Sequence, residues 1–203
     1  STSEIYGKNE QVPLSEDMDR VLGSTTKRRW SYSNTKALDE FLALAYHTVK
    51  KLPIVIVRLF NTVGPRQTGQ YGMVIPRFVS QALLGKPITV FGDGEQSRCF
   101  CHVIDVIDAI YKLVNSNEAE GEIFNIGSTE EISIKELAEL IKNMTDSKSE
   151  IKFIPYDEAY EKHFEDMRRR VPDTTKVNKL IGFNPKRKIK EIIKDIVDYY
   201  EKE

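Results

Sequence analysis

A tyrosine and a lysine four positions apart are the residues of this sequence best suited to chemistry. Tyr32 and Lys36 stand at the start of a strongly helical run, and residues four apart lie on one face of a helix. A free tyrosine has a pKa of about 10 and is a poor base at neutral pH, but a nearby positive charge favours the phenolate and lowers that pKa. The pair therefore predicts a general base that takes a proton from a hydroxyl while hydride leaves the same carbon. The hydroxyl of Thr2 is expected to bind the same substrate oxygen.

The spacing of this pair is common on amphipathic helices, where a half-buried tyrosine and a solvated lysine explain it without chemistry. The surrounding motifs are more specific. The sequence carries, in this order, Thr2-Ser3-Glu4-Ile5-Tyr6-Gly7, the pair itself, Arg58-Leu59-Phe60-Asn61-Thr62-Val63-Gly64-Pro65, and Phe91-Gly92-Asp93-Gly94 followed by Arg98. On these residues the chain resembles the extended short-chain dehydrogenase/reductase family, which contains NAD-dependent nucleotide-sugar epimerases, dehydratases and decarboxylases. The resemblance runs from Ser1 to about Ile193.

The resemblance implies roles for the residues that would do the chemistry. Thr2 is expected to hydrogen-bond the sugar hydroxyl that is oxidised, and Glu4 to act as a base or as a substrate contact. Tyr32 takes the place of the family's base, and Lys36 also holds the ribose next to the nicotinamide of NAD. Leu59 is assigned to the cofactor site. The structural alternative for Glu4 is a solvated loop carboxylate.

Four further residues are implied in binding a nucleotide-diphosphate sugar, which the resemblance identifies as a UDP-sugar. Asn61 is expected to contact the substrate phosphate and Phe91 to pack near the nucleotide base. Arg98 and Arg170 are expected to clamp the diphosphate, a role that suits guanidinium groups because they bind phosphate oxygens bidentately and stay charged. The structural alternatives are a turn former for Asn61, a core residue for Phe91 and a solvated basic loop for Arg170.

The resemblance leaves the fate of the oxidised sugar open. The ketone at C4 is reduced on the other face by an epimerase, loses CO₂ from a uronic acid in a decarboxylase, or loses water in a dehydratase. Ser3 stands where many dehydratases place an aspartate general acid, which disfavours loss of water. The segments 27–32 and 2–4 resemble UDP-glucuronate decarboxylases, whereas 64–67 and 71–73 resemble UDP-glucose 4-epimerase-like sequences. We place the epimerase-like function first and keep the decarboxylase, with Arg170 near the sugar carboxylate, and the dehydratase as alternatives.

Composition excludes several classes of protein. The chain has 203 residues, of which 40% are hydrophobic, with 30 basic and 31 acidic side chains. This is typical of a soluble globular protein, and the charge balance gives no bulk attraction to nucleic acid or membrane. No apolar run is long enough to span a bilayer. Cys99 and Cys101, with His102 beside them, are too few to form a zinc site. We expect buried, reduced thiols, which suits the cytoplasm, and no metal.

The elements that position these residues alternate between strands and helices, which predicts an α/β fold. The patterns predict strands over 53–60, 88–91, 98–102, 122–127 and 151–156, and helices over 31–50, 74–84, 105–115, 133–144, 174–181 and 189–200. Loops are expected over 1–28 and 61–72, and a loop or poorly buried helix over 157–170. Together with the resemblance, this predicts the C-terminal part of a Rossmann-like doubly wound sheet plus a smaller α/β substrate-binding domain.

The expected domain division follows from the same reading. Residues 1–72 would be the remaining part of the NAD-binding domain, and 73–203 mainly the substrate domain, with 99–127 returning to the Rossmann sheet. No glycine-rich turn of the kind that holds a dinucleotide pyrophosphate follows a strand, so the sequence resembles the back part of a longer enzyme.

The family also implies a homodimer through the helix that carries Tyr32. Leu38, Leu42 and Tyr46 would form that interface, or would simply cover the sheet. A rival of another class is a catalytically incomplete fragment that serves in substrate binding and dimerisation.

Overall fold

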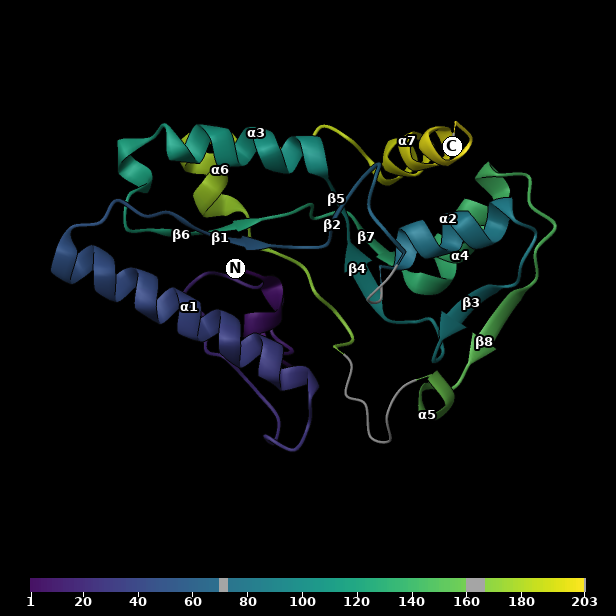
Figure 1. Cartoon of the computed structure of the whole chain (residues 1–203), viewed down its shortest axis with the longest axis horizontal. Coiled ribbons are helices and arrows are strands. Elements are labelled where there is room, and N and C mark those ends of the chain that lie inside the picture. Colours follow the sequence, from purple (N-terminus) through teal and green to yellow (C-terminus); the bar gives the residue numbers. More distant parts are fainter. Residues whose placement is uncertain (70–72, 160–166, 203) are drawn as a thin grey trace.

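The computed structural model describes residues 1–69, 73–159 and 167–202, and its elements alternate as the sequence predicts (Figure 1). Tyr71 and Gly72, which belong to the epimerase-like segment, lie outside the described residues, as do 160–166. The helices are α1 (Arg29–Lys50), α2 (Val74–Leu83), α3 (Val103–Val114), α4 (Ile134–Met144), α5 (Tyr156–Ala159), α6 (Thr175–Ile181) and α7 (Ile189–Tyr200), with 3₁₀ turns η1 (Ser3–Tyr6) and η2 (Asn117–Ala119). The strands are β1 (Ile56–Leu59), β2 (Thr62–Val63), β3 (Ile88–Phe91), β4 (Ser97–Cys99), β5 (Cys101–His102), β6 (Ile123–Ile126), β7 (Glu131–Ser133) and β8 (Ile151–Ile154).

A small parallel sheet organises the part of the molecule that contains the N-terminus. β1 pairs in parallel with β6, so that Leu59 lies opposite Ile126, and Thr2 forms a further parallel bridge to Leu59. The sheet lies between α1 on one side and α3 with α6 on the other (Figure 1). Parallel strands covered by helices are typical of α/β folds, and the mixed α/β architecture expected from the sequence is confirmed.

α1 buries a narrow face and exposes a broad apolar one. Its buried residues are Trp30, Ser33, Ala37 and Glu40, which follow helical spacing. The opposite face exposes Leu38, Phe41, Leu42, Tyr46 and Val49, each by more than half. These side chains therefore do not cover the sheet, which was one of the two interpretations open to Leu38, Leu42 and Tyr46.

A second group of elements packs around its own hydrophobic core. β3 pairs in parallel with β8 and β4 in antiparallel with β7, and α2, α4 and α7 lie near them (Figure 1). The core contains Phe78, Val90, Leu137 and Ile193 among others. α4 begins at the predicted capping box, in which the Ser133 hydroxyl accepts from the backbone of Glu136 and the Glu136 carboxylate accepts from that of Ser133.

Three local features differ from the sequence-based expectation. The strand expected over 98–102 is divided into β4 and β5 by Phe100, because the two halves pair with different partners, β7 and β2. The expected loops contain η1 and β2. These elements have two to four residues, too few for a hydrophobic period to be visible.

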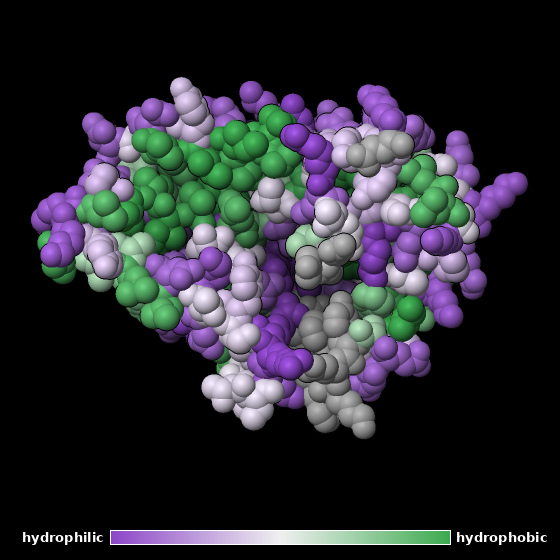
Figure 2. Space-filling view, viewed as in Figure 1, coloured by the Kyte–Doolittle hydropathy of each residue, from purple (hydrophilic) through white to green (hydrophobic). Residues whose placement is uncertain are grey.

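Apolar side chains also gather on the outer surface of α3. Figure 2 shows this hydrophobic area above the sheet, and the exposed residues on α3 include Ile104, Ile107, Tyr111 and Val114. Their helical spacing places them on one stripe.

Candidate active site

The segment with Thr2 and Glu4 lies where β1 ends. Thr2 bridges Leu59 and caps η1, because its hydroxyl accepts a hydrogen bond of 3.3 Å from the backbone of Glu4. η1 in turn packs against α1. Ligands of open α/β sheets bind at the carboxyl ends of the strands, so this segment and the N-terminal part of α1 lie next to such an end.

Tyr32 and Lys36 are both accessible on α1. The Tyr32 side chain is 52% exposed, whereas Lys36 is only partly buried and its ammonium lies 2.9 Å from the Asp39 carboxylate. The pKa of Lys36 is raised, chiefly by the hydrogen bond and charge of Asp39 and to a smaller degree by the charge of Tyr32. The main partner of the Lys36 ammonium is therefore Asp39, which the sequence analysis missed, and the catalytic role of the Tyr32–Lys36 pair stays a prediction. Asp39 follows Lys36 by three residues, a spacing that by itself predicts an ion pair on a helix.

Glu4 and Arg170 form a close ion pair across 166 positions of sequence. The Arg170 Nη2 atom lies 2.7 Å from Glu4 Oε1, and Arg29 Nη2 lies 3.5 Å from Glu4 Oε2. Arg170 is only 6% exposed, and its Nη1 atom also donates to the Ser3 hydroxyl at 3.5 Å. The solvated interpretations of Glu4 and of Arg170 are therefore wrong. Both side chains belong to one charged cluster beside η1.

The remaining arginines of the basic segment contact other carboxylates. Arg168 pairs with Asp93 at 2.9 Å, and Arg169 forms a bidentate pair with Glu131 in which both distances are 2.9 Å. Arg170 is thus the arginine of this segment that holds Glu4. Arg98, on β4, donates to the Ser97 carbonyl at 2.7 Å, and the backbone of Ser97 donates to the Arg168 carbonyl at 2.9 Å, so β4 lies beside the segment that carries Arg170.

Asn61 has a structural role at the end of β1. Its backbone is in the left-handed region, with a φ of 34°, and its side-chain amide donates to the Cys99 carbonyl at 2.8 Å. Its own carbonyl accepts from Cys101 at 3.2 Å. These bonds join β1 to β4 and β5, which fits the turn-forming interpretation, and they leave the predicted phosphate contact as a proposal.

Phe91, at the end of β3, is half-buried, and the guanidinium of Arg77 lies over its ring. The guanidinium carbon of Arg77 lies 4.1 Å from the Phe91 ring centroid, which is within the range of a cation–π interaction. Arg77, on α2, was not singled out from the sequence. Its position 14 residues before Phe91, in a different element, gives no pattern by which to find it.

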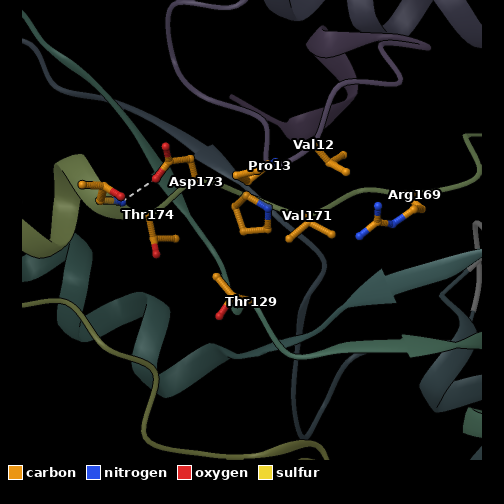
Figure 3. A pocket seen from close by; sticks show the side chains of 9 residues that line it. Val12, Pro13, Thr129, Arg169, Val171, Asp173 and Thr174 are labelled. Atoms are coloured by element: carbon orange, nitrogen blue, oxygen red, sulfur yellow. Dashed lines mark hydrogen bonds between the residues drawn. The ribbon is translucent and has the colours of Figure 1, made fainter.

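A cavity of about 330 Å³ lies elsewhere, between the loop around Pro13 and the segment 169–175. Figure 3 shows its lining residues, including Thr129, Arg169 and Val171, and the hydrogen bond accepted by the Asp173 carboxylate from the backbone of Thr175. None of the residues predicted for the site lines this cavity. Arg169 lines it while its neighbour Arg170 pairs with Glu4, so the cavity is not the predicted catalytic centre.

Cys99 and Cys101 are buried and not disulfide-bonded. Burial raises the pKa of each thiol to about 12, so both are protonated at neutral pH and unreactive. Within residues 1–69, 73–159 and 167–202, no group of three His, Cys, Asp or Glu side chains is arranged to hold a metal ion. In the same ranges no helix has the length and apolar character needed to cross a membrane.

Comparisons with known proteins agree with the motifs. The family model described as GDP-mannose 4,6 dehydratase matches residues 1–196. A UDP-N-acetyl-alpha-D-glucosaminuronate decarboxylase of Bacillus cytotoxicus is 43% identical over 98% of this chain and 62% of that protein. UDP-glucuronic acid decarboxylase 1 of Danio rerio is 35% identical over 100% of this chain and 46% of that protein. The chain thus spans about half to three fifths of the length of these curated relatives.

Solved structures give the same picture for the fold. The UDP-glucuronic acid 4-epimerase of Bacillus cereus, in complex with UDP-glucuronic acid and NAD, has a TM-score of 0.86 and 28% identity, over 100% of this chain and 60% of that chain. The dTDP-glucose 4,6-dehydratase of Bacillus anthracis, in complex with NAD, has a TM-score of 0.83 and 29% identity, over 100% and 60%.

Proposed function

Because the chain belongs to the GDP-mannose 4,6 dehydratase family, within the NAD-dependent nucleotide-sugar epimerases, decarboxylases and dehydratases, we propose that the protein containing it oxidises a UDP-linked sugar transiently at C4. One observation carries this proposal. The accessible Tyr32 and Lys36 lie on a helix that packs against the 3₁₀ turn following Thr2, at the carboxyl end of β1.

The described residues fit one end of the cofactor. Tyr32 is half exposed, Lys36 carries its ammonium on the same helix face, and Leu59 lies at the carboxyl end of β1, where dinucleotides bind in such sheets. These residues would hold the nicotinamide ribose. The sequence contains no Gly-x-Gly-x-x-Gly turn, so we do not expect the 203 residues alone to retain NAD. When bound, NAD accepts the hydride from C4 of the sugar.

The residues of the chain supply the proton transfer and the orientation. In this proposal Thr2 donates or accepts a hydrogen bond at the sugar O4 atom, and Tyr32 takes the proton from that oxygen. The positive charge of Lys36 stabilises the phenolate that performs this step. Asn61, Phe91 and Arg98 are proposed contacts of the phosphate, the base and the diphosphate.

We place the decarboxylase ahead of the epimerase, which reverses the order favoured by the sequence motifs. The curated relatives reported above are decarboxylases, and the Glu4–Arg170 pair supports the same choice. A guanidinium that already holds a carboxylate at 2.7 Å has the chemistry needed to orient the C6 carboxylate of a uronic acid. Arg170 is then a contact of the sugar rather than of the diphosphate, and Glu4 is a substrate contact or base.

The chemistry of decarboxylation follows from the ketone. Oxidation at C4 makes the C6 carboxylate of a uronic acid β to a carbonyl. The C5–C6 bond then breaks, CO₂ leaves, and the electron pair moves through C5 and C4 to the ketone oxygen. A proton adds to C5. Arg170 orients the carboxylate for this cleavage, while Tyr32 and Thr2 hold the oxygen that receives the charge.

A 4-epimerase is the second candidate. It is supported by the similarity to the UDP-glucuronic acid 4-epimerase of Bacillus cereus, whose structure is in complex with UDP-glucuronic acid and NAD. The same Tyr32, Lys36 and Thr2 would serve it, because both reactions begin with the C4 ketone. The two candidates differ in the fate of the ketone, because CO₂ leaves before it is reduced in a decarboxylase, whereas an epimerase keeps the carboxylate and reduces the ketone on its other face.

Product analysis separates the candidates. The complete protein that contains residues 1–203 would be incubated with NAD and either UDP-glucuronate or UDP-glucose, and the products identified by NMR. We expect release of CO₂ and a UDP-pentose from UDP-glucuronate, and no turnover of UDP-glucose. A UDP-galacturonate product would favour the epimerase. Unchanged sugars in both reactions would contradict the proposed function.

We also propose that the exposed face of α1 forms a homodimer interface. The apolar residues Leu38, Phe41, Leu42, Tyr46 and Val49 form a continuous helical surface, and an apolar surface of this kind is normally covered by a partner. Symmetric pairing of two α1 helices would cover it and would place two sites on one rigid bundle.

A further inference from the structure

A buried ion pair joins the helix that carries Tyr32 to the strand beneath it. Arg58, on β1, donates from Nε to Glu40 Oε1 at 3.0 Å and from Nη2 to Glu40 Oε2 at 2.8 Å. Both residues are 6% exposed. The contact is bidentate, so it fixes the direction of the Glu40 side chain as well as its distance.

The same guanidinium extends the contact to two other segments. Its Nη1 atom donates to the Tyr6 hydroxyl at 2.9 Å and to the Glu16 carbonyl at 2.7 Å. The Tyr6 hydroxyl donates to Asn125 Oδ1 at 2.7 Å, and Tyr6 and Asn125 are fully buried. The pKa of Arg58 is raised because its hydrogen bonds and the neighbouring Glu40 and Tyr6 outweigh the effect of burial.

Each segment with a proposed catalytic residue contributes a member of this network. Glu40 follows Lys36 by four residues and Tyr32 by eight, which places it one and two turns further along α1. Tyr6 belongs to the same 3₁₀ turn as Glu4, and Arg58 precedes Leu59, the residue that Thr2 bridges. The network therefore connects α1, η1 and β1, three elements that carry proposed site residues.

Other polar contacts of α1 lie nearer its start, where Arg20 donates to the Ser33 carbonyl at 3.5 Å and to Asn34 Oδ1 at 3.3 Å. Between Trp30, at its start, and Glu40, the buried residues of α1 are Ser33 and Ala37, whose short side chains can pack in several rotations. Further along the helix, the Arg58–Glu40 pair is a buried, bidentate contact on this face. Because Tyr32 and Lys36 are on the same helix, a rotation of α1 moves both away from Thr2.

We infer that Arg58 and Glu40 are positioning residues that hold the phenol of Tyr32 and the ammonium of Lys36 toward the substrate beside Thr2. The inference rests on the proposed function, since it assigns the network to the same reaction. Neither residue touches the reacting atoms. A lysine at position 58 would keep the charge but lose the planar fork that sets the direction.

The test compares variants that separate orientation from folding. Replacing a buried ion pair by apolar residues of similar volume often leaves stability unchanged, so the double variant Glu40→Leu with Arg58→Met is expected to fold, with a lower melting temperature because the Glu16 carbonyl and the Tyr6 hydroxyl lose their Arg58 donor. Arg58→Lys keeps the charge alone. The matched control is Arg169→Lys, which removes an equally bidentate pair with Glu131 outside the proposed site.

The expected result is a loss of kcat without a comparable change in KM. In the complete protein, both network variants should lower kcat roughly 10- to 100-fold, as expected when reacting groups shift by about 1 Å, with KM for the sugar nucleotide changed by less than about 3-fold. The rising limb of kcat against pH should move to higher pH, because Lys36 no longer supports the phenolate. The control should change neither quantity.

Two outcomes would overturn the inference. One is a double variant that folds and keeps both the kcat and the pH profile of the unchanged protein. The second outcome concerns the case in which no sugar nucleotide is turned over. The proposed function has then failed, and the orientation of α1 is measured directly on the 203-residue chain. Its residual dipolar couplings should show α1 reoriented relative to β1 and β6 in the double variant, and unchanged couplings of α1 would refute the positioning role.

Discussion

At the scale of residues, the candidate site consists of two kinds of side chain. Tyr32, Lys36 and Thr2 are accessible and suited to moving a proton. Arg170 and Glu4 form a shielded charged pair beside them. This arrangement keeps the proton-transfer group open to a substrate while the cation that would orient a carboxylate is fixed by its neighbours.

Tyr32→Phe tests the proton-transfer role most simply. The variant lacks only the hydroxyl, so we expect turnover to fall by about 10²- to 10⁴-fold, the usual worth of a general base, while UDP-sugar binding changes little. Calorimetric titration and product assays on the complete protein would measure the two effects. Tyr111→Phe, which changes an exposed tyrosine of α3, is the matched control. If the variant instead bound the UDP-sugar much more weakly but kept its kcat, Tyr32 would be a substrate-binding residue and not the general base.

At the scale of elements, α3 begins at a histidine that titrates. The buried His102 accepts a hydrogen bond of 3.1 Å from the backbone of Ile104 at Nδ1, which requires that nitrogen to be unprotonated. The pKa of His102 is lowered, first by burial and then by the charge of Arg187, while Asp195 and Asp105 act in the opposite direction. In the pH range between the lowered folded value and the unfolded value of about 6.5, the unfolded chain binds more protons than the folded one.

Stability should therefore fall as the pH is lowered through that window. Protonation at Nδ1 also removes the cap of α3, and the loss of a cap costs about 1 kcal/mol. Urea unfolding at several pH values would measure the free energy of unfolding. In His102→Asn the new side chain can still cap the helix but does not titrate. The free energy of unfolding of this variant should therefore change less between pH 7 and about pH 5. Parallel curves for the two proteins would rule out His102 as the cause.

Longer elements were predictable from the sequence because their apolar residues repeat. The helices α1, α2, α4 and α7 and the strands β1, β3 and β6 follow the predicted order with ends that differ by a few residues. β2 and β7 were not predictable, since two or three residues carry no period. Their positions depend on β5 and β4, which pair with them across long stretches of chain.

The site was predictable in its motifs but not in its contacts. The ion pair between Glu4 and Arg170 joins distant positions, and no spacing in one sequence indicates it. A signal did exist for Arg58, because a charge within an otherwise apolar strand needs a buried partner. The partner Glu40 lies on the face of α1 that includes Ser33 and Ala37, and the helical period does not indicate that face, because the apolar residues of this helix gather on the exposed one.

At the scale of the whole molecule, the exposed apolar face of α1 is the surface proposed for dimerisation. If this face forms the proposed homodimer, Leu42→Glu should convert a dimer of the complete protein into a monomer, because a charge would then be buried without a partner. Sedimentation velocity measures the change. Leu84→Glu places the same charge on a comparably exposed leucine after α2 and should leave the dimer intact. A dimer that survives Leu42→Glu would exclude this interface.

Transient oxidation at C4 is the claim on which both candidate functions depend, and a deuterium label at that carbon tests it. The complete protein with NAD would be mixed with UDP-glucuronate carrying either hydrogen or deuterium at C4, and single-turnover rates compared. We predict a slower reaction with deuterium, because the bond from C4 to its hydrogen breaks before carbon dioxide is lost. Equal rates, together with turnover that proceeds normally, would contradict the account.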